Sequence, residues 1–426
     1  MPAPDAGVAG VRTLSGLTPA SLAGTTVLVR SDLNVPLDDD GGVGDRTRID
    51  ASVPTLRHLV GAGAKVVVMS HLGRPKGEVR PELSLAPVAR ALSEALGRDV
   101  LLARESPGDP ALRTRVAGLP EGAVLLLENL RFLPGETAND AGLVEALAAL
   151  GDLYVQDAFG TAHRAHASTE GVPKQVRARG GAAVAGLLVE RELRYLGEAL
   201  ADPERPFVAV MGGAKISGKI DVIEAILPRV DRLLVGGAMA NTFFRALGLD
   251  TGKSLVEEDR VSMAADLMEE AGDRLILPVD CRVAEDLDSG RTPRVTGRDE
   301  VGAEDVIGDM GPESEALFAS EIESAATVVW NGPMGVFESA PFADGTLAIA
   351  RAMAARAERG GTSIVGGGDS AAAVEGAGLT GQMTHVSTGG GASLDLMAGR
   401  ELPGIQALDP ASADGGKAPS HASEVE

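Results

Sequence analysis

The stretch KVVVMSHLGR, residues 65–74, is a short apolar run that stops abruptly at polar and cationic side chains. A continuous apolar run of this length is typical of a strand buried on both faces, as in a parallel sheet. Further runs of the same kind recur along the chain: Thr25–Arg30, Ala123–Leu127, Leu153–Gln156, Phe207–Met211, Arg232–Val235, Arg274–Val279, Thr327–Trp330 and Ser363–Val365. The sequence therefore predicts a series of buried strands.

The segments between these runs have a helical pattern. In Ser84–Leu96 the apolar residues share one helical face, and Gly97 can end the helix. Strands that alternate with helices predict an α/β fold with a doubly wound parallel sheet. Because 426 residues exceed what one hydrophobic core usually organises, we expect two such Rossmann-like domains.

The domain junction is expected near the middle of the chain. Gly186–Asp202 has a helical pattern and is followed by Pro203 and Pro206, which would stop a helix. The near-equal halves on either side favour a connecting helix, although an ordinary surface helix would show the same pattern. The final residues, 411–426, have little apolar content, and we expect them to form a disordered tail.

Charge and cysteine usage exclude several classes of protein. The formal charge of −22 argues against nucleic acid or an anionic membrane as the main partner, since either needs a basic surface. A single cysteine, Cys281, cannot form an intramolecular disulfide, which fits a reducing compartment. No apolar run reaches the roughly 20 residues of a membrane helix, and the first residues do not resemble a signal peptide. We therefore expect a cytoplasmic protein.

In the first half of the chain, cationic side chains gather near the predicted strand ends, where ligands bind in open α/β sheets. The candidates are Arg48, Arg74, Arg131 and Arg164, beside His71. Guanidinium groups make planar, bidentate contacts with phosphate and carboxylate, so the cluster suits a small polyanionic metabolite. Any one of these arginines alone would more often be a surface charge or an ion-pair partner.

In the second half, glycine follows the predicted strands. The segments are Gly212-Gly213-Ala214-Lys215, Gly236-Gly237-Ala238, Asn331-Gly332-Pro333 and Gly366-Gly367-Gly368-Asp369-Ser370. Backbone N–H groups at such turns bind phosphate oxygens, which suits a nucleotide. Asp369 would then hold Mg²⁺, or it would instead cap the following helix. Gly389-Gly390-Gly391 repeats the device and could offer N–H groups to a phosphoryl group in transfer.

Two common nucleotide-binding motifs are not met. Gly213–Lys219 has the glycine-to-lysine spacing of a Walker A loop, but Ile220 stands where Ser or Thr must reach magnesium. Gly248–Ser254 ends correctly but is one residue too short. No predicted strand is followed by the G-x-G-x-x-G turn of a dinucleotide-binding domain.

Taken in order, these segments resemble phosphoglycerate kinase from about Leu14 to about Leu408. The segments that carry the resemblance are Arg30-Ser-Asp-Leu-Asn-Val-Pro36, Ser70-His-Leu-Gly-Arg-Pro75, Leu127-Glu-Asn-Leu-Arg-Phe132, Asp157-Ala-Phe-Gly-Thr-Ala-His-Arg-Ala-His166, Gly212–Lys215, Trp330-Asn-Gly-Pro-Met-Gly-Val-Phe-Glu338, Gly366–Ser370 and Thr388-Gly-Gly-Gly-Ala-Ser393. The family implies reversible phosphoryl transfer between 1,3-bisphosphoglycerate and MgADP, giving 3-phosphoglycerate and MgATP. It also implies hinge closure, and we expect a monomer.

The resemblance also assigns residues and boundaries. The residues that it assigns to phosphoglycerate binding are Asp32, Leu33, Asn34, Arg48, His71, Leu72, Gly73, Arg74, Arg131 and Arg164. The residues that it assigns to nucleotide binding are Lys215, Lys219, Gly236, Gly237, Asn331, Pro333, Glu338, Gly367, Gly368, Asp369 and Ser370, and Asp369 is the expected Mg²⁺ ligand. The residues expected to contact the reacting phosphoryl group are Arg48, Lys215, Lys219, Gly389 and Gly390. The implied organisation is a substrate domain (1–185), a hinge helix (186–205), a nucleotide domain (206–392) and a segment returning to the first domain (393–410).

Four positions depart from the family pattern: Ser31, Gln156, Gly218 and Ile307. Ile307 stands where a glycine beside the nucleotide base is common, so it bears on the adenine pocket. One rival interpretation is a catalytically inactive protein that binds nucleotide or phosphoglycerate. Another is a phosphotransferase with a different small acid. An inactive relative would be expected to have lost a residue of the reacting centre, and Arg48, Lys215, Lys219 and Asp369 are all present.

Overall fold

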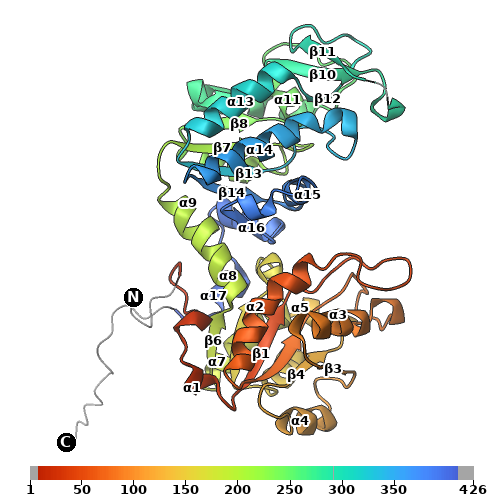
Figure 1. Cartoon of the computed structure of the whole chain (residues 1–426), viewed down its shortest axis with the longest axis vertical. Coiled ribbons are helices and arrows are strands. Elements are labelled where there is room, and N and C mark those ends of the chain that lie inside the picture. Colours follow the sequence, from red (N-terminus) through yellow and green to blue (C-terminus); the bar gives the residue numbers. More distant parts are fainter. Residues whose placement is uncertain (1–7, 291, 411–426) are drawn as a thin grey trace, which may run out of the picture. The chain divides into compact units, whose positions relative to one another are not determined.

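The computed structural model describes residues 8–290 and 292–410, and the expected tail at 411–426 lies outside the described residues. The chain divides into two compact units, which meet along the sequence at Arg194–Tyr195 and again at Glu401–Leu402. Unit 1 holds the earlier residues together with the last described segment, and unit 2 holds those in between. Figure 1 colours the chain from the N-terminus in red to the C-terminus in blue.

Unit 1 is built on a six-stranded sheet in the order β3-β4-β2-β1-β5-β6, in which every neighbouring pair is parallel. Its strands are β1 (Thr26–Ser31), β2 (Lys65–Met69), β3 (Val100–Ala103), β4 (Val124–Leu127), β5 (Leu153–Asp157) and β6 (Ala182–Ala185). Its helices are α1 (Pro19–Leu22), α2 (Thr47–Gly61), α3 (Ala86–Leu96), α4 (Pro110–Ala117), α5 (Pro134–Ala138), α6 (Ala141–Ala148), α7 (Val172–Ala178), α8 (Leu187–Glu192) and α17 (Pro403–Gln406).

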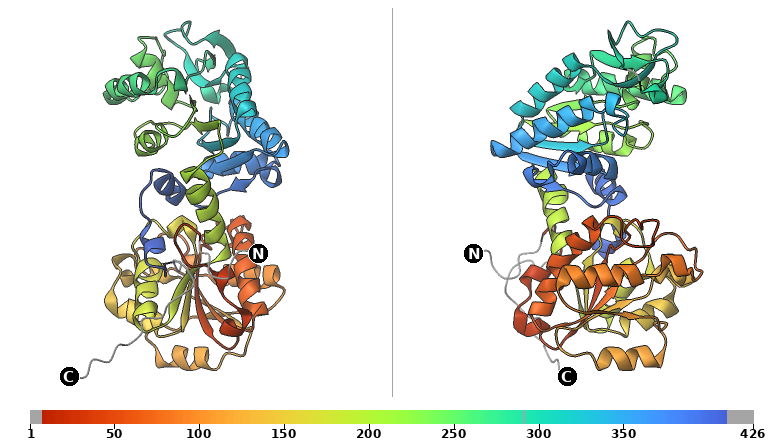
Figure 2. Two further views of the ribbon diagram at one scale, coloured as in Figure 1. Left: turned by 90° about the vertical axis from the view of Figure 1, so that its left-hand side faces the viewer. Right: turned by 45° about the vertical axis from the view of Figure 1, so that its right-hand side comes forward.

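Helices cover both faces of this sheet, as the two views of Figure 2 show. α2 packs against α3 and α8, whereas α6 packs against α7. β2 after Lys65 and the whole of β4 are apolar, as expected of strands in the interior of the sheet, and almost every side chain is buried. α3 ends at Gly97, whose φ of 69° is left-handed, so the predicted end of that helix is confirmed.

Unit 2 has a second parallel sheet in the order β15-β14-β13-β7-β8-β9. Its strands are β7 (Phe207–Met211), β8 (Arg232–Val235), β9 (Leu275–Ile276), β13 (Thr327–Asn331), β14 (Thr362–Gly366) and β15 (His385–Val386). Its helices are α9 (Ala199–Ala201), α10 (Ile220–Ile226), α11 (Met239–Ala246), α12 (Val261–Ala271), α13 (Pro312–Ser324), α14 (Asp344–Glu358), α15 (Gly368–Gly376) and α16 (Gly391–Met397). The predicted α/β class with parallel sheets is confirmed.

Unit 2 also contains a small antiparallel sheet that the sequence did not predict. It consists of β11 (Arg294–Gly297), β10 (Asp280–Ala284) and β12 (Val306–Met310), with β10 in the centre. The strand predicted over Arg274–Val279 is wrong in extent, since only Leu275–Ile276 pairs with the parallel sheet. The chain leaves that sheet before Pro278, which has no N–H to continue a ladder.

The two ends of the described chain lie together along the edge strand β6. The N–H of Asp409 donates to Ala183 O, and the N–H of Ala183 donates back to the Asp409 carboxylate at 2.9 Å. The other carboxylate oxygen forms an ion pair with Arg177 on α7 at 2.7 Å. The N–H of Arg12 donates to Asp409 O, so this one residue fastens the returning segment, the sheet edge and the N-terminal stretch.

We predict that Asp409→Ala lowers the free energy of unfolding by about 1 kcal/mol, because a buried N–H and a guanidinium lose their acceptor. Urea denaturation followed by circular dichroism measures this change. The control is Glu94→Ala, which removes an exposed ion pair with Arg46 in the same unit and should cost less than about 0.5 kcal/mol. Equal stability of the two variants would contradict the fastening role of Asp409.

Candidate active site

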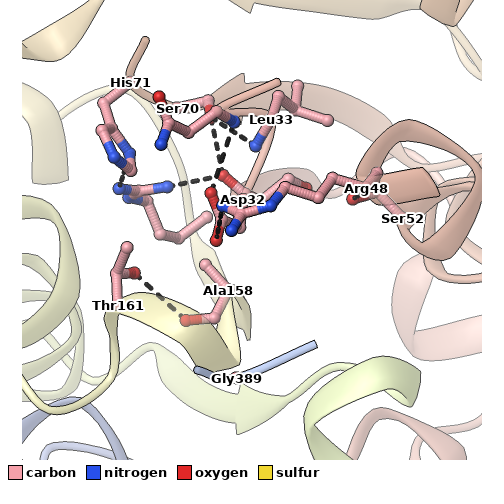
Figure 3. A network of polar contacts seen from close by, with 12 residues as sticks. Asp32, Leu33, Arg48, Ser52, Ser70, His71, Ala158, Thr161 and Gly389 are labelled. Carbon is pink, nitrogen blue, oxygen red and sulfur yellow. Dashed lines mark hydrogen bonds and ion pairs between the residues drawn. The ribbon is translucent and has the colours of Figure 1, made fainter. Parts of the chain in front are cut away.

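The carboxyl ends of β1 and β2 are joined by one buried serine. The hydroxyl of Ser70 donates to Ser31 O at 2.8 Å and accepts the N–H of Leu33 at 3.0 Å (Figure 3). The next residues are held as firmly, since Asn34 Oδ1 accepts the N–H of Gly73 at 2.8 Å. The two loops that follow β1 and β2 therefore form a single layer.

Arg48 projects from the first turn of α2 toward Asp32. Its Nη1 donates to Asp32 Oδ2 at 2.8 Å, and both side chains keep solvent access, with 38% and 13% of their surface exposed (Figure 3). A half-exposed ion pair of this kind fixes the direction of a long side chain but contributes little to stability. An incoming anion can therefore replace part of the interaction between Arg48 and Asp32.

His71 is buried against a second arginine. Arg30, 1% exposed within β1, donates from Nη2 to Nδ1 of His71 at 3.0 Å. A guanidinium group can only donate, so Nδ1 is the acceptor and the ring proton lies on Nε2. Burial, followed by the charges of Arg30, Arg131 and other arginines, holds the pKa of His71 well below its ordinary value. His71 is therefore a neutral hydrogen-bond donor near pH 7.

A depression of about 600 Å³ opens beside these loops, and half of the residues that line it are cations. Its charged and imidazole side chains are Arg74, Lys76, Arg131, Arg164 and His166. Burial, together with Arg164 and Arg30, lowers the pKa of Arg131 to about 10. In a chain of net charge −22, four cations gathered around one cavity suit an anion.

Of the predicted substrate residues, Arg74, Arg131 and Arg164 line the depression, whereas the others lie in the loops after β1 and β2 or, for Arg48, on α2. Leu72 is buried there, and its N–H donates to Asn129, whose own N–H₂ group bonds Leu72 O and Leu83 O. Gly73 O accepts from Arg131 at 2.9 Å. Sequence reasoning gave no role to Arg30 or Lys76. An arginine at the end of the apolar run TVLVR was the available signal for Arg30.

In unit 2, glycines at the strand ends allow the backbone to pack closely. Gly332 has a φ of 94°, and a Cβ there would lie 2.3 Å from Gly212 O. Gly237 has a φ of 68°, and a Cβ there would lie 2.5 Å from the backbone N of Gly213. Both positions need glycine for conformation and for space, so the loops after β7, β8 and β13 form one surface.

Lys219 is mostly buried between these loops. Its ammonium group donates to Asn331 O at 3.0 Å and to the Asn331 side chain. Burial lowers the pKa of Lys219 to about 8, with the nearby Asp369 charge acting in the opposite direction. Asn331 Nδ2 is buried without an acceptor among residues 8–290 and 292–410. A cation and a free amide donor at this edge suit phosphate oxygens.

A pocket of about 240 Å³ lies at the same edge. Of the residues assigned to the nucleotide, Gly237, Pro333, Glu338 and Asp369 line it, together with Gly213 of the glycine segment after β7. Further lining residues that sequence reasoning did not assign include Asn241, Phe244, Met334 and Val336. Lys215 is exposed and is not among the lining residues, while Ser370 is buried beneath, accepting the N–H of Gly332 at 2.6 Å.

Asp369 is an exposed carboxylate at the start of α15, near Lys219. The alternative that it caps a helix is wrong, because α15 has Gly367 at its N-cap and no side-chain capping bond. Its carboxylate is exposed and makes no hydrogen bond or ion pair within the described ranges 8–290 and 292–410. Those ranges contain no cluster of three or more metal-ligating side chains. A single carboxylate beside a phosphate site fits Mg²⁺, which takes few protein ligands.

The positions that depart from the family pattern are accommodated in different ways. Ile307 lines the pocket, and its N–H donates to Ser254 at 2.9 Å. Its neighbour Gly308 lies against Phe342, where a Cβ would meet the ring at 2.3 Å. Gly218 is exposed and Gln156 is buried within β5.

The N–H of Gly389 already donates to Ser387 at 3.1 Å, which leaves Gly390 as the freer of the two predicted donors.

Each α/β unit is built on a parallel sheet. A cluster of cations that suits an anion in one unit, and a glycine-lined site beside an exposed carboxylate in the other, indicate a two-domain phosphotransferase. The family model of phosphoglycerate kinase matches residues 17–400. The chain belongs to the phosphoglycerate kinase family, so the resemblance found in the sequence is confirmed. Among the described residues, no helix has the length and apolar character needed to cross a membrane.

Individual relatives agree over nearly the full length. Phosphoglycerate kinase of Chlorobium chlorochromatii (strain CaD3) is 51% identical over 401 residues, covering 93% of this chain and 99% of the relative. That of Chlorobaculum tepidum is 52% identical with the same coverage. The phosphoglycerate kinase structure from Coxiella burnetii has a TM-score of 0.83 and 41% identity, covering 93% of this chain and 98% of that one. The structure from Pyrococcus horikoshii OT3 has a TM-score of 0.80 and 34% identity, with the same coverage.

We predict that nucleotide affinity falls as the pH rises above about 8, because Lys219 then loses its charge in the free protein. Calorimetric titration with MgADP between about pH 6.5 and pH 9.5 should show a several-fold loss of affinity. Lys219→Arg keeps its charge over this range and should bind with little pH dependence. The same loss in Lys219→Arg would show that another group titrates.

Proposed function

We propose that the chain catalyses reversible phosphoryl transfer between 1,3-bisphosphoglycerate and MgADP, giving 3-phosphoglycerate and MgATP. The observation that carries this proposal is the cationic depression of unit 1 in a strongly acidic chain of this family. Its arginines suit the phosphate and carboxylate of a small glycolytic acid, and the glycine loops of unit 2 suit a nucleotide. The inactive alternative has no observation in its favour.

The chemistry requires charge compensation rather than a base. The attacking group is a carboxylate of 3-phosphoglycerate in one direction and a phosphate of ADP in the other, and both are ionised near pH 7. The barrier lies in aligning the oxygens and in offsetting charge on a loose, metaphosphate-like group. We assign Arg48, Lys215 and Lys219 to the oxygens of that group, and backbone N–H donors at Gly389 and Gly390 to the same task, for which Gly389 would exchange its bond to Ser387.

The remaining assignments follow the chemistry of each group. Asp369 would hold Mg²⁺, which when bound offsets the charge of the nucleotide phosphates. Glu338 would accept the ribose hydroxyls, and Asn331 Nδ2 would donate to a phosphate oxygen. Asp32, Asn34, His71 and the arginines of unit 1 would orient phosphoglycerate. Adenine is the proposed base, bound in the pocket that Ile307 lines.

We further propose that residues 186–205 act as a hinge between a substrate domain (1–185) and a nucleotide domain (206–392), with 393–410 returning to the first. The proposal is supported by the irregular helix there: α8 passes into a π-helical segment, Leu193–Glu198, before α9. Such π-helical turns often mark functional sites. The composition and the single cysteine favour a cytoplasmic protein, and we propose a monomer.

The proposed reaction is tested by a coupled assay of ATP-dependent turnover of 3-phosphoglycerate with magnesium present. We expect turnover by the wild type and its near loss in Asp369→Ala, since one carboxylate carries the metal. Calorimetry with MgADP is the accompanying measurement. Absence of wild-type turnover, with nucleotide still bound, would favour the inactive protein or a different acid substrate.

We predict that Arg48→Ala lowers kcat by about a hundredfold, the usual effect of removing a preorganised donor to transition-state charge. The KM for 3-phosphoglycerate should rise much less, because the cations that line the depression, among them Arg74, Arg131 and Arg164, are unchanged. Steady-state kinetics separate the two effects. Loss of affinity as large as the loss of turnover would mean that Arg48 serves only in binding.

Hinge closure is tested by an engineered crosslink that holds the two units apart. We expect such a crosslink to abolish turnover and to spare MgADP binding, since the nucleotide residues all belong to unit 2. Cleavage of the crosslink should restore activity. Full turnover with the crosslink in place would contradict closure.

A further inference from the structure

Glu136, on the short helix α5, is a carboxylate buried inside unit 1 with 1% of its surface exposed. It is not among the residues assigned above. Both of its oxygens are held by a single residue: Oε1 accepts the hydroxyl of Ser168 at 2.6 Å, and Oε2 accepts the Ser168 N–H at 3.1 Å. A buried charge is costly unless it is paired and hydrogen-bonded, so its partner charge must be close.

That partner is reached through the same serine. Ser168 is fully buried, and its hydroxyl accepts Nε–H of Arg30 at 2.8 Å while it donates to Glu136. A hydroxyl can accept and donate at once, whereas a guanidinium only donates and a carboxylate only accepts. The direction of every hydrogen in this chain is therefore fixed, and the two buried charges are paired through one hydroxyl.

The other end of the guanidinium holds the imidazole of His71. Arg30 Nη2 donates to Nδ1 of His71 at 3.0 Å, which leaves the proton on Nε2. A continuous chain thus runs from Glu136 through Ser168 and Arg30 to His71. A shift of the guanidinium would free the ring to rotate or to change tautomer.

The serine itself is fixed in place. The hydroxyl of Tyr154, buried on β5, donates to Ser168 O at 2.8 Å. Ser168 belongs to the π-helical turn Ala167–Gly171, which packs tightly against α6: a Cβ on Gly171 would lie 2.3 Å from Val144 Cγ2. The chain of hydrogen bonds therefore ends in rigid parts of the fold, as a positioning device requires.

We propose that Glu136 and Ser168 are positioning residues for the anion site. Through Arg30 they hold His71 in one orientation and one tautomer, with Nε2–H as a neutral donor to the substrate. The inference rests on the proposed function, because it concerns how phosphoglycerate is recognised. It adds two buried residues, neither of which touches the substrate, to the determinants of substrate affinity.

Ser168→Ala is the principal test, because it breaks the chain without changing a charge. We expect the KM for 3-phosphoglycerate to rise about three- to tenfold, the factor for one lost hydrogen bond, with the KM for ATP unchanged. Glu136→Gln keeps the shape and one acceptor oxygen and should show a smaller rise of the same kind. It serves as the second variant if Ser168→Ala does not fold.

The matched control is Ser363→Ala in unit 2. Ser363 is also a fully buried serine, and its hydroxyl donates to Met353 O at 2.8 Å; it is the second residue of β14, away from the carboxyl ends of the strands. This variant should lose similar stability in thermal denaturation and keep both KM values. Kinetics are measured below the melting temperature of every variant, so that a loss of fold is separated from a loss of positioning.

Nitrogen NMR of the imidazoles gives a readout that general destabilisation would not move. The chain has only 6 histidines, and His71→Gln identifies the signal of His71. We expect the wild type to show His71 as a single Nε2–H tautomer near pH 7, and Ser168→Ala to show averaging between tautomers. Unchanged KM for 3-phosphoglycerate in both Ser168→Ala and Glu136→Gln would overturn the proposal. Lack of activity in the wild type would instead overturn the proposed function.

Discussion

A parallel strand covered by helices on both faces has little room for polar side chains except at its ends, and both units of this chain follow that constraint. The interior strands β2, β4, β7 and β13 are buried almost throughout, and the chemistry-bearing residues come immediately after them. Because all neighbours in each six-stranded sheet are parallel, these ends meet at one edge. The position of both candidate sites follows from this arrangement.

The two candidate sites at the strand ends differ in their electrostatics. In unit 1, cations are brought together in a chain that is otherwise strongly acidic, and burial followed by their mutual repulsion lowers the pKa values of Arg131 and His71. Burial, with the arginine charges as a further cause, keeps His71 neutral, so the site can combine charged donors at its surface with an uncharged donor beneath them. An arriving polyanion would relieve this repulsion, which is a favourable contribution to binding.

In unit 2 the backbone has the leading role. Gly332 and Gly237 allow three loops to approach within distances that no Cβ would permit, and Lys219 lies among them with a lowered pKa. Close packing of the backbone thus creates the buried environment that lowers the pKa of Lys219. The glycine that sequence reasoning connected with phosphate is equally required by the loops themselves, so a substitution there would disturb the fold and the site together.

The sequence by itself determined the α/β class, most parallel strands and the segments that carry the candidate site, because uninterrupted apolar runs and the motifs after them are local signals. Strands β3, β6 and β15 were not predicted, since β3 is a partly exposed edge strand, β6 is mostly alanine and β15 is only two residues long. The small antiparallel sheet lacked a comparable signal. Only the tertiary structure decided that Glu136, Ser168, Arg30 and His71 form one chain of hydrogen bonds, because these residues lie far apart in sequence and meet only when α5 and the Ala167–Gly171 turn pack beside β1.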